Sequence, residues 1–278
     1  MSDKEISLSV YNMKVLAKRE LTSSLYGWGF YAAIFISSLV SSFILKNFLQ
    51  GIIAENIFIT SFPLNFPLFT SIIIISFYLV IVSAISISRE KVQGTLEILF
   101  CGPVSSSSFL LSKYFTDMAL YLIILGFFVF YFLGASLLTN LGFTWDLIKA
   151  FLVSIFLASC MISFGLFISS LTSKIRSSIV WVIGLLIAFL AVWFLQNIFI
   201  NIPSEALSLW MRYLQKALVI IHQFVNWVSP FSCLSRGMEA IRAGSMKLLA
   251  LNILYSIIYT VILLILSIYI LKAKGAKA

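Results

Sequence analysis

Charged residues are scarce in this sequence of 278 residues. Asp, Glu, Lys and Arg together make up 10% of the chain, whereas a soluble globular protein has about a quarter. Hydrophobic residues make up 61%, and the mean hydropathy is +1.08. Because so little charge cannot cover a water-exposed surface, the composition excludes an ordinary soluble protein and indicates a polytopic membrane protein.

Residues that carry covalent chemistry are equally scarce. There is one histidine, His222, and the chain lacks the motifs G-x-x-x-x-G-K-[ST], H-E-x-x-H and G-x-S-x-G. The three cysteines, Cys101, Cys160 and Cys233, have no C-x-x-C spacing, and we expect them to lie apart: at one face, inside the membrane and at the other face. We therefore predict no enzymatic activity, no disulfide, and no cofactor or metal held by this chain.

Six apolar runs are each long enough, at about 1.5 Å per residue, to cross a hydrocarbon core of about 30 Å. They cover approximately residues 25–45, 67–88, 115–138, 147–172, 178–200 and 249–271. The runs are continuous and not alternating, which favours a helical bundle over a barrel. The prediction is an all-α protein with six transmembrane helices in one membrane domain over residues 1–278.

The distribution of lysine and arginine predicts the orientation. Placing both termini in the cytoplasm puts more of these residues on the inner face than on the outer face. The basic residues lie at helix ends and form no stripe with interleaved aromatics, so the net charge of +9 favours contact with anionic lipid and not with nucleic acid. We expect an integral membrane protein with both termini cytoplasmic.

Two regions outside the apolar runs have amphipathic patterns. Residues 8–23 are predicted to form an elbow helix in the headgroup plane before the first span. Residues 201–248 are predicted to form two helices on the outer surface, with Ser229 capping the second, Pro230 at its first position and Gly244 ending it.

Small residues recur at four-residue spacing inside two of the spans. Examples are Ser37 with Ser41 in the first span and Gly165 with Ser169 in the fourth. Such pairs favour close approach between membrane helices.

The stretch between the second and third spans is polar and contains several residues that typically start or stop a helix. Residues 89–91 form a charge cluster, and residues 94–97 have the composition of a helix start. Gly102-Pro103 stops that helix, and residues 105–108 supply capping hydroxyls ahead of Lys113. The pattern predicts a short rigid helix across one membrane face; a well-capped surface loop is the alternative.

The same stretch resembles permeases of type 2 ABC (ATP-binding-cassette) exporters. The matching residues are Arg89-Glu90-Lys91, Gly94-Thr95-Leu96-Glu97-Ile98-Leu99, Pro103-Val104-Ser105 and Ser112-Lys113, with Lys18-Arg19-Glu20-Leu21 in the elbow and Ser229-Pro230-Phe231 and Arg236-Gly237 before the last span. The motifs occur in the family's order over essentially the whole chain. Cys101-Gly102 departs from the small or polar residues that the family more often has before the proline.

The resemblance implies the transmembrane subunit of an exporter in a prokaryotic plasma (inner) membrane. A separate nucleotide-binding ATPase subunit would bind ATP and Mg, and two permease chains would face each other around a central path. The implied ATPase-coupling residues are Lys18, Arg19, Glu20, Arg89, Glu90, Lys91, Gly94, Thr95, Leu96, Glu97, Leu99, Pro103, Ser105 and Lys113. Candidates to line the path, and to meet an amphipathic or lipid-like cargo, are Phe77, Tyr78, Trp181 and Trp193.

Two alternatives stay open at this point. The only ionisable residues inside the predicted spans are Asp117 and Lys149, each expected to reach the interface, so no internal proton relay is predicted. That shortage also fits a non-transporting membrane scaffold or assembly subunit, whereas a membrane-embedded enzyme lacks a nucleophile, a base and a metal site. The sequence leaves the cargo open, and likewise the choice between homodimer and heterodimer.

Overall fold

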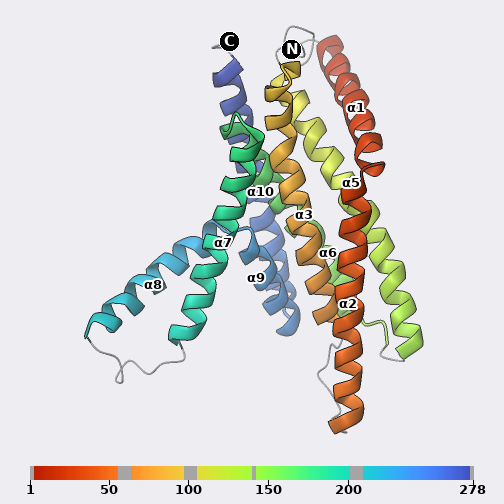
Figure 1. Cartoon of the computed structure of the whole chain (residues 1–278), viewed down its shortest axis with the longest axis vertical. Helices are drawn as coiled ribbons and strands as arrows, with labels where there is room; N and C mark the ends of the chain where they lie inside the picture. The colour runs from red at the N-terminus through yellow and green to blue at the C-terminus, as the bar shows by residue number, and fades with distance from the viewer. Residues whose placement is uncertain (1–2, 56–63, 97–104, 140–141, 201–208, 276–278) are drawn as a thin grey trace.

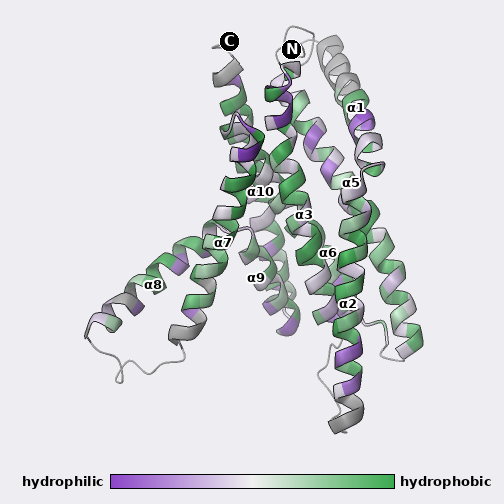
Figure 2. Ribbon diagram, viewed as in Figure 1, coloured by the Kyte–Doolittle hydropathy of each residue, from purple (hydrophilic) through white to green (hydrophobic). Residues whose placement is uncertain are grey.

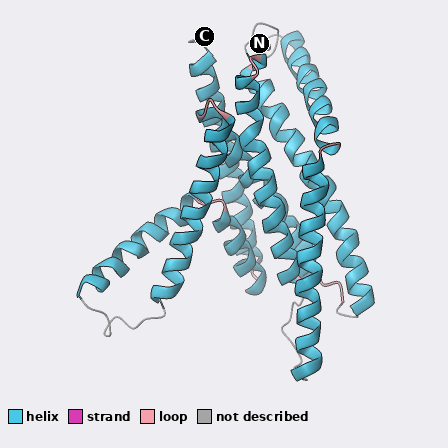
Figure 3. Cartoon of the chain, in the orientation of Figure 1, coloured by secondary structure: helices cyan, strands magenta, loops and turns pink. Residues whose placement is uncertain are grey.

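The computed structural model describes residues 3–55, 64–96, 105–139, 142–200 and 209–275, and within these ranges it contains helices and no strand (Figure 3). The helices are α1 (Asp3–Leu25), α2 (Trp28–Glu55), α3 (Asn65–Val92), α5 (Ser106–Thr139), α6 (Trp145–Leu171), α7 (Ile175–Ile200), α8 (Leu209–Val228), α9 (Phe231–Arg242) and α10 (Met246–Gly275). The all-α prediction is confirmed.

Six of these helices are long and apolar enough to cross a membrane: α2, α3, α5, α6, α7 and α10. Each overlaps one of the six predicted runs over nearly its whole length, so the described chain is that of a polytopic integral membrane protein. The third span begins nine residues earlier than the predicted 115, because Ser105 caps it: the backbone N–H of Ser108 donates to Ser105 Oγ at 3.2 Å.

The bundle is built around α3 and α6, of which α6 is the most buried candidate span in the described chain. A Cβ added at Gly165 of α6 would lie 2.6 Å from the carbonyl oxygen of Val80 in α3. One turn further along α6, the N–H of Ser88 donates to Ser169 Oγ at 3.0 Å. The predicted close packing at these small residues is confirmed, since only glycine lets the two backbones approach this closely.

The first described residues of α1, the end of α3 and the end of α10 lie at the same end of the bundle (Figure 1). The hydrophilic residues of α3 gather there, and the middle of the bundle is hydrophobic (Figure 2). The predicted elbow is a helix, and it breaks from α2 at Gly27. It runs beside α5 and not across the end of the bundle (Figure 1), because its second half is held to α5 by polar contacts, among them Thr116 Oγ1 to the carbonyl of Ala17 at 3.3 Å.

Two helices, α8 and α9, precede the last span as predicted, but they do not lie flat on the outer surface. They meet at a bend of 91°, and α9 packs between α6 and α10. A Cβ added at Gly237 would lie 2.4 Å from Val153 Cγ1, and Ser229 at the bend is buried. α8 packs against α7 (Figure 1), whereas α9 turns into the bundle, because one of its faces is small and apolar enough to pack there. Its end is as predicted: Gly244 follows α9 with φ of +61°.

The course of α9 corrects the expected separation of the cysteines. Cys233 of α9 and Cys160 of α6 are both buried and both free, and they interact with each other. Cys233 Sγ lies 2.7 Å from Ser256 Oγ, and Cys160 Sγ donates to the Ser256 carbonyl at 3.6 Å. Cys101 lies outside the described residues.

We predict that Gly165→Ala lowers the free energy of unfolding by about 1–3 kcal/mol, because the added methyl group overpacks the contact with α3. Unfolding of the purified protein in detergent measures the change. Gly126→Ala is the matched control, since a Cβ there meets nothing within 4 Å and alanine favours a helix over glycine. Equal effects of the two changes would contradict close packing at Gly165.

Candidate functional site

A buried ion cluster joins three helices at the end of the bundle where α3 ends. Lys113 of α5 contacts the carboxylate of Glu20 in α1, and its Nζ lies 2.5 Å from Glu90 Oε1 in α3. The three side chains are 7%, 17% and 11% exposed, respectively. Sequence analysis assigned all three residues to the coupling set, and the structure brings them together.

The cluster has one cation for two carboxylates. Burial raises the pKa of the Glu20 carboxyl above its ordinary value, and the ammonium of Lys113 opposes that shift. The second carboxylate oxygen of Glu90 is buried without a hydrogen-bond partner in the described part of the chain. Lys113 therefore offsets the free-energy cost of burying both carboxylates in a low-dielectric environment.

Lys91 joins the end of α3 to the end of α6. Its Nζ donates to the carbonyl oxygens of Ser170 at 2.8 Å and Thr172 at 2.9 Å. Ser170 lies in the last turn of α6 and Thr172 is its C-cap residue. A cation at this position satisfies unpaired carbonyl acceptors and interacts favourably with the negative end of the helix dipole. Lys91 thus faces the interior of this chain, as Glu20, Glu90 and Lys113 do.

The chain turns at Gly94, whose φ of +68° is the left-handed conformation that favours glycine after a helix. Thr95 Oγ1 then donates to the Glu90 carbonyl at 3.3 Å, and residues 95 and 96 are helical. Leu96 packs against the core. The predicted residues Glu97, Leu99 and Pro103 lie outside the described residues, and Ser105 caps the start of α5.

A polar cavity of about 490 Å³ opens beside the ion cluster between α1, α3 and α5. Its lining includes Arg19, Glu20, Arg89, Glu90, Lys113 and Asp117. Arg19 and Arg89 are exposed, and so is the neighbouring Lys18. These three residues are the members of the predicted set with basic groups that a partner can reach.

Asp117 corrects the sequence interpretation, which expected it to reach the interface. It is buried, and it accepts a hydrogen bond of 2.5 Å from Ser83 Oγ. The longer α5 explains the difference, because Asp117 lies three turns inside that helix. Asp117 lies four residues after Lys113, so both side chains are on one face of α5. This spacing was the sequence feature from which the position of Asp117 next to Lys113 could have been predicted.

The three predicted path residues whose side chains the structure describes have different surroundings. Phe77 packs its ring against Phe231 of α9 at 5.4 Å, and Tyr78 faces Gly29 of α2. Trp181 is exposed on α7, and the side chain of Trp193 lies outside the described residues.

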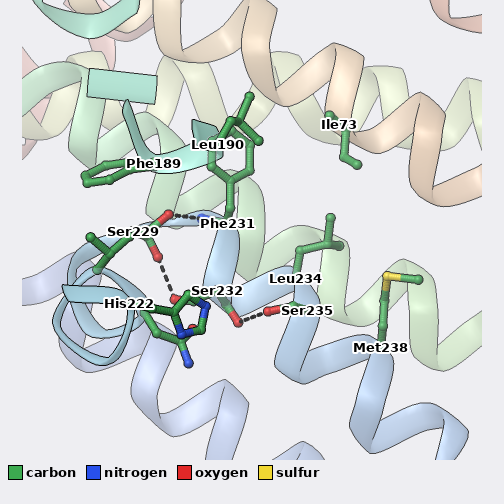
Figure 4. A pocket seen from close by; sticks show the side chains of 12 residues that line it. Ile73, Phe189, Leu190, His222, Ser229, Phe231, Ser232, Leu234, Ser235 and Met238 are labelled. Carbon is green, nitrogen blue, oxygen red and sulfur yellow. Dashed lines mark hydrogen bonds between the residues drawn. The ribbon is translucent and has the colours of Figure 1, made fainter. Parts of the chain in front are cut away.

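A second cavity, of about 290 Å³, lies between α3, α7 and the bend of α8 and α9. Figure 4 shows Phe189 and Leu190 on one side of it and His222, Ser232 and Ser235 on the other. No sequence pattern predicted this site, because its walls come from four helices that meet only after α9 turns into the bundle.

The described chain has six apolar spans, and the ion cluster joins two of them, α3 and α5, to α1 beside a segment with ABC permease motifs. This combination is that of a membrane component of a transporter. The family model described as ABC-2 family transporter protein matches residues 7–276. The chain therefore belongs to the ABC-2 transporter family and is a transmembrane subunit of an ABC transporter. Comparisons with curated proteins and with solved structures give no match.

We predict that Lys113→Met lowers the free energy of unfolding by about 3–5 kcal/mol, because it leaves Glu20 and Glu90 buried without their cation. Unfolding in detergent at neutral pH measures the loss. The matched control is Lys149→Met, which removes a more exposed pair with Asp146 and should cost at most about 1 kcal/mol. A loss at Lys113 no larger than at Lys149 would show that the cluster does not hold the three helices.

Proposed function

We propose that this chain is the transmembrane subunit of an ATP-driven exporter and that it couples to a separate ATPase subunit at the end of the bundle where α3 ends. The supporting observation is the Glu20–Lys113–Glu90 cluster, which ties α1, α3 and α5 together beside the segment that resembles the family's coupling segment. ATP and Mg bind to the ATPase subunit, and this chain forms the path.

The cluster gives a route for force. A push on the segment between Gly94 and Ser105 acts on the end of α3 and the start of α5, which Glu90 and Lys113 join. Lys91 extends this connection to α6. Helices connected in this way move as one body, which is how interfaces convert a local change into a domain rotation.

The exposed basic side chains at this end of the bundle contact the partner. Arg19 and Arg89 are exposed and line the polar cavity, whereas Glu20 and Glu90, the described acids of the predicted set, are mostly shielded from solvent and paired with Lys113. We assign to Arg19, Arg89 and Lys18 the polar contacts with the ATPase, and to Lys91, Glu20, Glu90 and Lys113 the transmission of force within this chain.

The orientation and the assembly follow from the same assignment. The coupling end, and with it both termini, faces the cytoplasm of a prokaryotic cell. A second permease chain, identical or related, packs beside this one. The large apolar surfaces of α7 and α10, which are the least buried of the described spans, face that chain and the lipid.

We predict that Arg89→Glu weakens binding of the partner ABC ATPase subunit by at least tenfold, because a central arginine contact is typically worth about 2 kcal/mol or more. Binding is measured with purified proteins in detergent. Lys46→Glu is the matched control, because it makes the same charge change at an exposed position near the opposite end of α2.

Equal binding by the wild-type chain, Arg89→Glu and Lys46→Glu would contradict the assignment of the partner surface. A chain that binds the ATPase but supports no ATP-driven movement of any cargo in vesicles would be a scaffold and not an exporter subunit.

A further inference from the structure

The cavity at the bend of α8 and α9 is divided into an apolar part and a polar edge. Phe189 and Leu190 of α7 and Met238 of α9 contribute apolar walls. His222 and Asn226 lie one turn apart on α8 and contribute polar groups to the lining. Figure 4 shows the His222 ring on the side opposite Phe189 and Leu190.

The polar edge has unused hydrogen-bonding capacity. Within the described part of the chain, neither the His222 ring nor the Asn226 side-chain amide has a hydrogen-bond partner, whereas Ser232 Oγ donates to the Ser229 carbonyl at 2.6 Å and Ser235 Oγ to the Ser232 carbonyl at 3.2 Å. A neutral imidazole offers one donor and one acceptor, and an amide offers both as well. Together they can pair with a hydroxyl, an ester or an amide group of a ligand.

The charges around the cavity disfavour an ionised ligand. None of the described residues that line it is Asp, Glu, Lys or Arg. The nearby Arg236 already has partners: its guanidinium donates to the backbone carbonyl of Asn226 and lies 4.4 Å from the centre of the Tyr255 ring. A charged headgroup would lose its hydration here without gaining a counter-ion, which costs several kcal/mol.

The size of the cavity limits the apolar part of the ligand. Its volume of about 290 Å³ is at the lower end of the range of about 300–1,000 Å³ for small-molecule sites. This space suits one chain and not the two chains of a bilayer phospholipid. Met238 adds an adaptable wall, because the methionine side chain is unbranched and flexible.

We infer that this cavity binds a single-chain amphiphile with an uncharged polar head, the head at His222 and Asn226 and the chain against Phe189, Leu190 and Met238. The site deepens the proposed function, on which its role in export rests, by giving the cargo a chemical class. Binding itself requires only this chain, so it can be tested apart from ATP-driven transport.

The test uses the purified full chain in detergent, without an ATPase, and three photoreactive probes of equal chain length: a diazirine-bearing fatty alcohol, fatty acid and alkylammonium. Peptide mapping by mass spectrometry locates the label. We expect the alcohol to label residues of the cavity at least tenfold more than either charged probe does. Equal labelling of the cavity by the three probes would overturn the inference.

Cavity-filling variants locate the site. Leu190→Trp should reduce labelling of the cavity by the alcohol about tenfold or more, while Leu195→Trp, an exposed position on the same helix outside the lining, should leave it unchanged. Met238→Trp provides a second filling variant if Leu190→Trp does not fold. Unchanged labelling in the folded filling variant would contradict binding in the cavity.

Binding measurements on His222 variants test the polar edge separately. His222→Leu should weaken binding of the alcohol about two- to tenfold, the value of one hydrogen bond, and should leave binding of a matched alkyl probe without a head unchanged. His222→Gln, which keeps a donor and an acceptor, should restore binding of the alcohol. Equal losses for the alcohol and the alkyl probe would refute the assignment of the head to His222.

Intact binding of the alcohol together with failure of ATP-driven transport would count against the proposed function and would leave the binding site supported.

Discussion

The shared cation Lys113 is the constraint on which the arrangement of this protein depends. Two carboxylates from different helices, Glu20 and Glu90, are taken out of water at the end of an apolar bundle. Neither acid is stable there as an ion unless the ammonium group remains between them, because a buried unpaired charge costs several kcal/mol. This requirement fixes α1 against α5 and α5 against the end of α3, so the position of three helices follows from one side chain.

The other helices differ in how directly they are connected to this cluster. Lys91 and the close contact at Gly165 hold α6 to α3, and α9 packs on α6 and α10. α7 and α8 pack on each other at the side of this core (Figure 1), and the apolar cavity lies where they approach α3 and α9. α7 is also held to α3, by a hydrogen bond of 2.6 Å from Ser178 Oγ to the Ala84 carbonyl.

Periodicity and composition were sufficient to predict the six spans and the all-helical fold, because lipid permits few other solutions for long apolar runs. Capping residues predicted the end of α9 at Gly244. The third span was predicted to start at 115, nine residues too late, although residues 105–108 were identified as capping hydroxyls. The inward course of α9 could not be predicted, because it depends on contacts such as Gly237 against Val153, between residues far apart in the sequence. The expected separation of Cys160 and Cys233 was wrong for the same reason. The candidate coupling residues were predicted from their resemblance to a family pattern, but the pattern did not reveal that Lys113 contacts both Glu20 and Glu90.

The most direct test of the account is the distance between α1 and the end of α3 in the working assembly. Spin labels at the exposed positions Lys14 and Gln93, in a Cys101→Ser background, report this distance by double electron–electron resonance in liposomes that also contain the ATPase. The account predicts one narrow distance distribution that ATP does not change, and a broad distribution in the Lys113→Met variant. An ATP-dependent change in the distance in the unsubstituted cluster, or a distribution that Lys113→Met leaves narrow, would contradict the claim that the ion cluster holds these helices as one body.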